Sequence, residues 1–271
     1  MPELPEVETV MRGLEPVLYG STIAHMTLNR PDLRFPFPET LAETIVGKKC
    51  VSLRRRGKYI WLDFANGQTL VVHLGMSGSF TINPANNDLH DHVILETETG
   101  DKIVYNDPRR FGMFFLVETG LEHVHPSFTL MGPEPLGNNF NADRLIDSIK
   151  HKQSHIKTAL LDQSVVAGIG NIYACEALYL AGISPFRKCS SIGPKRATRL
   201  VQAIRTVLTD AIESGGSTLR DHRQTDGSMG YFQHSFKVYG KTGQTCPETG
   251  DKIKRITQAG RSTFYCPAKQ R

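Results

Sequence analysis

The spacing of apolar residues changes near residue 131, and that change restricts the fold more than any other feature. From about residue 22 to 131, apolar residues form short, often alternating runs bounded by glycine, asparagine, aspartate or proline. Such runs are typical of antiparallel strands in a sandwich or barrel. From about residue 142 they recur every three or four residues, as in amphipathic helices. We therefore predict an α+β protein with an antiparallel β-sandwich followed by a helical part.

The same pattern places the individual elements. A first helix over 5–18 should flank the sandwich, and MGPEPLG at 131–137 is the expected linker. Further elements are expected as helices over 143–150, 156–163, 172–181 and 194–214, a polar loop over 217–235, and a hairpin within 236–271 that turns at Ala259–Gly260. We therefore divide the chain into residues 1–131, 132–236 and 237–271.

Charge is unevenly distributed. The formal net charge is +5, but residues 231–271 hold eight basic and two acidic residues, which leaves −1 for the preceding 230. Such asymmetry is typical of a nucleic-acid-binding module, and a solvated basic face without a partner is the alternative. The sequence contains no run of about 18 apolar residues, so we predict no membrane-spanning segment. The acidic N-terminus does not resemble a secretory signal, and five widely spaced cysteines do not form a disulfide framework. We expect a reduced, cytoplasmic protein without membrane contact.

The N-terminal sequence MPELPEVET contains a candidate nucleophile. Removal of Met1 would leave Pro2 as a secondary amine whose pKa should lie well below that of lysine, so that part of it is unprotonated near neutral pH. Glu3 and Glu6 lie beside it and can serve as acid, base or orienting group. A helix start whose acidic residues complement the helix dipole explains the same residues without any catalysis.

Nine motifs stand in one order along nearly the whole chain, and together they carry a family resemblance. They are MPELPEVET at 1–9, RRRGKY at 54–59, HLGMSG at 73–78, HDH at 90–92, DPRRFG at 107–112, GPEPL at 132–136, LLDQSVVAGIGNIY at 160–173, GGST at 215–218 and AGRSTFYC at 259–266. This set resembles bacterial formamidopyrimidine-DNA glycosylases, which repair 8-oxoguanine. Leu4 favours this branch over endonuclease VIII, whose N-terminus would read PEGPE.

The resemblance implies a role for each catalytic candidate. Pro2 is the nucleophile that attacks the sugar C1′ and forms a Schiff base, and Glu3 is the proton donor during base release and ring opening. Glu6 supports that end of the helix. Lys58 assists β-elimination and contacts phosphate, and Arg261 holds the phosphates beside the lesion and takes part in δ-elimination.

The resemblance also implies a DNA-binding surface. Met76, Arg109 and Phe111 correspond to the triad that fills the void left by a flipped nucleotide, in which Arg109 pairs with the orphaned cytosine. The other implied DNA contacts are made by His90, Arg109 and Lys152, by Lys157 and Asn171 as a phosphate clamp, and by a base-capping loop at roughly 217–231. Backbone N–H groups at 168–171, at a helix start, should add an anion site.

The three predicted parts then become a catalytic β-sandwich domain, a helix–two-turn–helix DNA-binding domain with the capping loop, and a degenerate zinc-finger-like hairpin. The hairpin departs from the family because its two CxxC pairs read Cys246–Thr249 and Cys266–Lys269. A structural zinc site needs four nitrogen or sulfur ligands, and Glu248 and Asp251 are weak replacements. We predict no tightly bound zinc and no required cofactor; a Cys246–Cys266 disulfide is disfavoured in a reducing cytosol.

The predicted function is a bifunctional DNA glycosylase/AP lyase that excises oxidised purines, 8-oxoguanine and formamidopyrimidines, by β,δ-elimination. Its expected partner is double-stranded DNA with oxidised bases or abasic sites, and the protein should be a monomer. Two alternatives remain open at this point: a non-catalytic binder of damaged DNA, suggested by the incomplete zinc site, and an endonuclease VIII-like enzyme that favours oxidised pyrimidines.

Overall fold

The computed structural model describes residues 1–217, 225–226 and 230–271. They form two compact units, the first made of Met1–Thr129 with Ser214–Gln233 and the second of Leu130–Glu213 with His234–Arg271. The hairpin that we set apart at residue 237 therefore clusters with the helices. Part of the expected capping loop clusters with the sandwich, because the Ile82 N–H donates to the Thr225 carbonyl at 3.0 Å.

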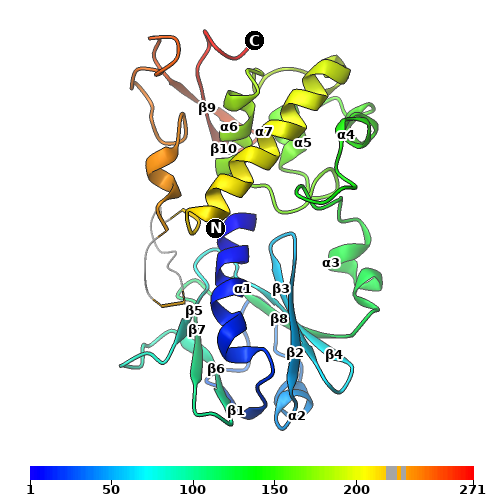
Figure 1. Cartoon of the computed structure of the whole chain (residues 1–271), viewed down its shortest axis with the longest axis vertical. Helices are drawn as coiled ribbons and strands as arrows, with labels where there is room; N and C mark the ends of the chain where they lie inside the picture. The colour runs from blue at the N-terminus through cyan, green and yellow to red at the C-terminus, as the bar shows by residue number, and fades with distance from the viewer. Residues whose placement is uncertain (218–224, 227–229) are drawn as a thin grey trace. The chain divides into compact units, whose positions relative to one another are not determined.

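The first unit contains two four-stranded antiparallel sheets, as the alternating pattern predicted (Figure 1). One sheet has the order β1 (Ile23–Leu28), β6 (Asp91–Thr97), β7 (Lys102–Asn106) and β5 (Ser79–Ile82). The other has the order β2 (Cys50–Arg56), β3 (Tyr59–Phe64), β4 (Gln68–His73) and β8 (Met113–Glu118). Helix α1 (Leu4–Leu18) contacts strands of both sheets. The short helices of this unit are α2 (Leu41–Ile45), η1 (Glu122–Val124) and α3 (Pro126–Thr129).

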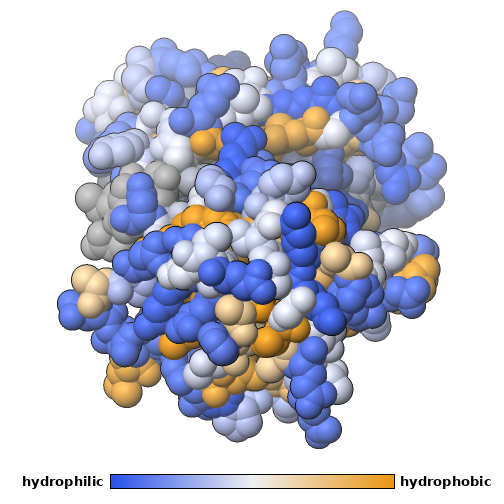
Figure 2. Space-filling model, turned by 60° about the horizontal axis from the view of Figure 1, so that its bottom comes forward, coloured by the Kyte–Doolittle hydropathy of each residue, from blue (hydrophilic) through white to orange (hydrophobic). Residues whose placement is uncertain are grey.

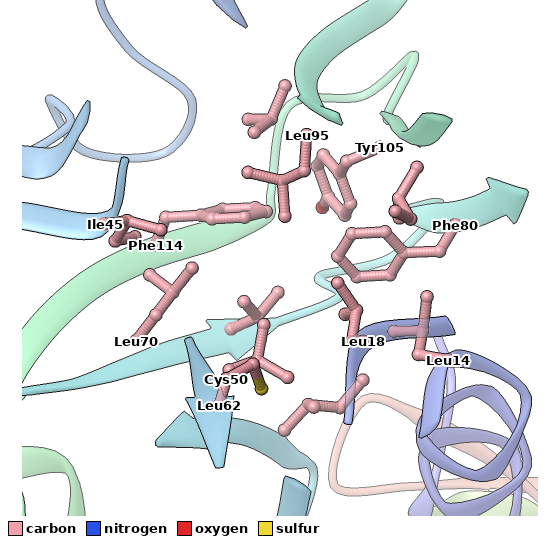
Figure 3. Close-up of a cluster of buried hydrophobic side chains, with 14 of the residues drawn as sticks. Leu14, Leu18, Ile45, Cys50, Leu62, Leu70, Phe80, Leu95, Tyr105 and Phe114 are labelled. Atoms are coloured by element: carbon pink, nitrogen blue, oxygen red, sulfur yellow. The ribbon is translucent and has the colours of Figure 1, made fainter. Parts of the chain in front are cut away.

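The core of this unit lies where α1 meets the inner faces of the sheets (Figure 3). Leu14 and Leu18 of α1 are buried with the aromatic rings of Phe80, Tyr105 and Phe114. The Tyr105 and Phe114 ring centroids lie 4.8 Å apart in an edge-to-face arrangement, which aromatic pairs favour. This packing fixes α1, and with it the N-terminus of the chain.

An ion pair also holds α1 against β2. Arg55 Nε lies 2.7 Å from a carboxylate oxygen of Glu8, and both side chains are mostly buried. Because β2 leads directly into the turn that carries Lys58, this ion pair links the start of α1 to that turn.

The second unit contains the helices that the three- and four-residue spacing predicted. They are α4 (Ala142–Ile149), α5 (Ile156–Leu160), α6 (Asn171–Leu180) and α7 (Pro194–Glu213), with the 3-10 turns η2 (Cys189–Ser191) and η3 (Phe232–Ser235), the latter starting at the boundary between the two units. Helix α5 ends three residues earlier than predicted. Asp162 there accepts hydrogen bonds from both the N–H and the hydroxyl of Ser164, which favours a turn over a further helical turn.

The predicted hairpin forms from β9 (Lys254–Gln258) and β10 (Arg261–Tyr265). Gln258 pairs with Arg261, so Ala259 and Gly260 are the two turn residues, as expected. Their φ angles of 48° and 73° are the positive values that the tightest hairpin turns require.

On the face shown in Figure 2, hydrophilic side chains predominate and the hydrophobic ones lie in several separate groups. Among the described residues, no helix combines the length and apolar character needed to cross a lipid bilayer.

Candidate active site

The N-terminus of α1 gathers three of the predicted catalytic residues. Pro2, Glu3 and Glu6 are all buried, whereas Met1, which precedes them in the sequence, is 46% exposed. Glu3 caps the helix, and Glu6 Oε2 accepts a hydrogen bond from the Glu3 N–H at 2.9 Å. This reciprocal arrangement is a capping box, so both the dipole-complementing and the catalytic interpretations of these residues are compatible with it.

The second carboxylate oxygen of Glu6 is bound by Ser217. Glu6 Oε1 accepts hydrogen bonds from the Ser217 N–H at 2.9 Å and from the Ser217 hydroxyl at 2.8 Å. Sequence reasoning missed Ser217 as a site residue although it lies in the GGST motif. The two residues are 211 positions apart, and no local pattern connects them.

Lys58 lies in the two-residue turn between β2 and β3 and is only 7% exposed. Gly57 precedes it with a φ of 57°, which favours glycine. Burial lowers the pKa of the Met1 terminal amine; Glu3 and Glu6 act in the opposite direction, and the charges of Lys58 and Arg109 lower it further. An amine at this place is therefore more readily unprotonated than one in water.

His73 lies near the same charges and was not predicted as a site residue. Burial first, and then the charges of Lys58 and Arg34, lowers its pKa to about 4. Its Nδ1 accepts a hydrogen bond from the Gly75 N–H at 3.1 Å, which requires an unprotonated ring nitrogen. His73 is therefore neutral at physiological pH and adds no further positive charge beside Lys58.

Met76, Arg109 and Phe111 lie on two neighbouring loops and are exposed. Met76 is 37% and Phe111 42% exposed. The Arg109 guanidinium lies 5.1 Å from the centroid of the Phe111 ring. An apolar and cationic tip of this kind is available to another molecule.

Asp107 fastens these two loops together. It is fully buried, and its carboxylate accepts hydrogen bonds from the Ser77 hydroxyl at 2.6 Å and the Gly112 N–H at 2.8 Å. Ser77 Oγ in turn accepts the Arg109 N–H at 3.2 Å. Asp107 and Ser77 both lie in motifs that carried the family resemblance, but their bracing role was not foreseen.

Two further DNA-binding candidates lie at partly exposed positions. His90 is half-buried, with its ring 6.1 Å from that of His92. Lys152 forms an ion pair with Asp162 at 2.7 Å. The loop expected at 217–231 lies largely outside the described residues.

The predicted phosphate clamp of Lys157 and Asn171 faces the hairpin. Lys157 is 1% exposed, and its ammonium donates to the Thr263 hydroxyl at 2.8 Å. Asn171 Nδ2 donates to the Ser262 carbonyl at 2.8 Å. Arg261, the residue before Ser262, is exposed at the hairpin tip.

One of the four N–H groups expected to form an anion site at 168–171 is used within the protein. The Gly168 N–H donates to Gln163 Oε1 at 2.8 Å. The side-chain amide of Gln163 also donates to the Ile169 carbonyl at 3.0 Å. Gln163 therefore braces the glycine turn, a role that the sequence motif did not indicate.

All five cysteines are buried free thiols, so Cys246 and Cys266 do not form a disulfide. Their CxxC partners in this chain, Thr249 and Lys269, supply a hydroxyl and an ammonium group. An ammonium group has no lone pair to donate, so these four residues do not fit a tetrahedral zinc site. Within the part of the chain that the structure describes, no group of three or more histidine, cysteine or acidic residues is arranged to hold a metal.

Comparison with known proteins gives matches over nearly the whole chain. The formamidopyrimidine-DNA glycosylase N-terminal domain matches residues 1–114, and the H2TH domain of the same enzymes matches residues 131–223. The formamidopyrimidine-DNA glycosylase of Jannaschia sp. (strain CCS1) is 54% identical over the full length of both chains.

Two solved structures illustrate the structural likeness. Lactococcus lactis Fpg in complex with DNA containing an abasic site is 34% identical, with a TM-score of 0.90 over 99% of each chain. MutM in complex with DNA containing carbocyclic 8-oxo-G is 35% identical, with a TM-score of 0.89 over 99% of each chain.

Proposed function

This chain belongs to the formamidopyrimidine-DNA glycosylase family, and we propose that Pro2, exposed by loss of Met1, is the nucleophile of its reaction. It is a DNA glycosylase/AP lyase of base excision repair. The observation that carries the assignment of the nucleophile is the place of Pro2, which is buried at the start of α1 beside the buried Glu3 and close to Glu6. An unprotonated amine keeps the lone pair that attack on carbon requires.

The proposed first step is attack by the Pro2 nitrogen on C1′ of the damaged nucleotide. The glycosidic C–N bond breaks and the base leaves, the Pro2 nitrogen loses its proton, and O4′ takes up a proton as the sugar ring opens, which leaves an iminium cation, the Schiff base, between Pro2 and C1′. We assign proton donation to Glu3, which is buried next to Pro2 in the sequence. A carboxyl group donates a proton only in its neutral form.

Glu6 and Ser217 are proposed to position this site. Glu6 binds the Glu3 N–H through one oxygen and Ser217 through the other, so its carboxylate links the helix start to the segment at 217. A nucleophile held in one geometry avoids much of the entropic cost of reaching its target.

Strand cleavage is assigned to Lys58 and Arg261. Loss of a proton from C2′ of the Schiff base breaks the C3′–O bond in β-elimination, and δ-elimination then breaks the C5′–O bond. The positive charge of Lys58 beside the Schiff base can hold the phosphate that leaves. Arg261, exposed at the hairpin tip, can hold phosphate oxygens in a bidentate manner.

Access to the base requires that the nucleotide leave the duplex, which costs a few kcal/mol. We propose that the exposed side chains of Met76 and Phe111 enter the vacated space, as apolar wedges do in other DNA-bending proteins. Arg109 then pairs with the orphaned cytosine through its fork of N–H donors. His90 and Lys152 are proposed to contact the DNA backbone, which fixes the register and carries no sequence information.

The proposed substrates are oxidised purines opposite cytosine in double-stranded DNA, together with abasic sites. The likeness to MutM bound to 8-oxo-G-containing DNA supports this class. We further propose that the protein acts as a monomer in the cytoplasm and requires no cofactor.

A nicking assay tests the function and separates it from both alternatives. A duplex with one 8-oxoguanine·cytosine pair should be nicked by the wild type, while Glu3→Gln should impair base excision more than incision at a pre-formed abasic site. Binding without nicking would favour a non-catalytic damaged-DNA binder. Faster cleavage of a duplex with a damaged thymine would favour an enzyme for oxidised pyrimidines.

A further inference from the structure

The segments on either side of the β9–β10 hairpin, together with helix α6, bring a group of polar side chains to the place where two CxxC pairs would put four thiolates. We define the finger cluster as Tyr179, Cys246, Glu248, Thr249, Cys266 and Lys269. The Tyr179 hydroxyl lies 3.2 Å from Cys246 Sγ, and the Thr249 hydroxyl lies 3.3 Å from Cys266 Sγ. Each thiol therefore already has a hydroxyl partner within the protein.

The charged members of the finger cluster pair with each other. Lys269 forms an ion pair with Glu248, and its ammonium nitrogen lies 4.5 Å from the centre of the Tyr179 ring. A fixed positive charge at one of the four CxxC positions repels a divalent cation. The cluster thus opposes a metal through charge as well as through the missing thiolates.

Apolar packing supplies cohesion that a metal would otherwise give. Cys246 and Cys266 are almost completely buried in a hydrophobic cluster with Val238, Ile253 and Phe264. The Phe264 ring centroid lies 4.8 Å from that of Tyr239. Structural metals commonly hold small domains that lack such a core.

Helix α6 binds the segment 237–239, which precedes the hairpin. The buried carboxylate of Glu176 accepts three backbone N–H groups, from Lys237 at 2.8 Å, Val238 at 3.0 Å and Tyr239 at 2.8 Å. Tyr179 is one turn further along α6 and reaches Cys246. Asn171, at the start of the helix, holds the Ser262 carbonyl.

We propose that this hairpin is a metal-independent finger, in which the finger cluster replaces zinc and helix α6 positions Arg261. The family's zinc site is changed at two of its four positions, and the remaining two thiols serve as hydrogen-bonding core residues. Chelators should therefore leave both the fold and the DNA incision unchanged.

Metal content gives the first test. Purified, untagged full-length protein should contain far less than one zinc per chain by elemental analysis. Its thermal unfolding midpoint and nicking rate should be the same before and after dialysis against a strong chelator. Stoichiometric zinc, or a midpoint that falls on chelation and recovers with added zinc, would overturn the proposal.

The hydroxyl of Tyr179 gives the second test. Tyr179→Phe removes only the hydroxyl group that is hydrogen-bonded to Cys246. It should lower the thermal unfolding midpoint by about 2–4 °C, the shift expected from one lost hydrogen bond in a chain of this size. Tyr19→Phe is the matched control, because the Tyr19 side chain is exposed and lies outside the hairpin. Equal midpoints for Tyr179→Phe and the control would show that the cluster does not hold the finger.

Restoring the thiolates gives the third test. The double variant Thr249→Cys/Lys269→Cys should bind one zinc per chain, and its unfolding midpoint should become sensitive to chelators. Failure to bind zinc would show that the finger cluster does not occupy metal-ligand positions, and this part of the proposal would be wrong. Zinc stoichiometry is measured without any activity assay, so this result is independent of the proposed catalytic residues.

Discussion

Replacement of Asp107 by asparagine tests how the exposed Met76, Arg109 and Phe111 are positioned. The buried Asp107 carboxylate accepts hydrogen bonds from the Ser77 hydroxyl at 2.6 Å, the Gly112 N–H at 2.8 Å and the Tyr105 hydroxyl at 3.3 Å. Hydrogen bonds to a charged group contribute about 1 kcal/mol more than neutral ones. Asp107→Asn keeps the shape but removes the charge from these bonds, so we expect a loss of about 2–3 kcal/mol of stability.

This loss corresponds to a fall of about 5–10 °C in the thermal unfolding midpoint for a chain of this size. Because Asp107 fastens both loops, excision of 8-oxoguanine from a duplex should fall about tenfold or more, equivalent to about 1.4 kcal/mol. Incision of an abasic site in single-stranded DNA should fall less, because no stack has to be opened there.

The matched control is Asp143→Asn, which makes the same chemical change at an exposed position in α4. It should unfold and excise nearly as the wild type does. A wild-type midpoint and excision rate for Asp107→Asn would refute the bracing role. Equal losses on duplex and single-stranded substrates would show that Asp107 does not act through the wedge residues.

Three further predictions concern other parts of the molecule. His73 has a folded-state pKa of about 4, below the value of about 6.5 for an unfolded histidine, so the unfolded state binds more protons between these values and stability falls as the pH is lowered through this window. His73 should account for roughly 2–4 kcal/mol of that fall in the free energy of unfolding. Urea titrations at several pH values should show that the free energy of unfolding of His73→Gln declines less steeply as the pH is lowered. The same decline as in the wild type would contradict this role of His73. Arg261→Ala should weaken DNA binding and reduce the slope of log K against log salt by about 0.9, and the same slope as wild type would exclude a phosphate contact by Arg261. Thr263→Val removes a buried hydroxyl that accepts from Lys157 at 2.8 Å and donates to Gln258 at 3.1 Å, so its unfolding midpoint should fall by several degrees and Thr263→Ser should restore it. A wild-type midpoint for Thr263→Val would mean that the hydroxyl does not stabilise the hairpin.

Local sequence patterns predicted the two sheets, the longer helices and the hairpin of this fold, but not the short helices α2 and α3. Alternating apolar runs predicted the two sheets, and Gly260 indicated the hairpin turn because glycine adopts a positive φ without steric cost, although Ala259 has a positive φ as well. Helix α5 was predicted too long, because the side chain of Asp162 competes for backbone N–H groups in a way that apolar spacing does not reveal.

Contacts between distant residues were not predictable in the same way. Ser217 hydrogen-bonds to Glu6, which lies 211 positions earlier in the sequence. Lys157, expected from the family resemblance to contact phosphate, is buried against Thr263 of the hairpin. Both pairings depend on tertiary structure, and a single sequence carries no local signal for them. Asp107 lay within a recognised motif, but only its three partners in the structure reveal that it braces the loops.

The covalent step is the central claim, and reductive trapping tests it most directly. Fully processed enzyme, with Met1 removed as judged by mass analysis, is mixed with a duplex containing 8-oxoguanine in the presence of borohydride. We predict a stable protein–DNA adduct whose crosslinked peptide begins at Pro2, and none with Pro2→Gly. Efficient strand cleavage without any trapped adduct, or an adduct mapped to Lys58, would contradict the assignment of Pro2.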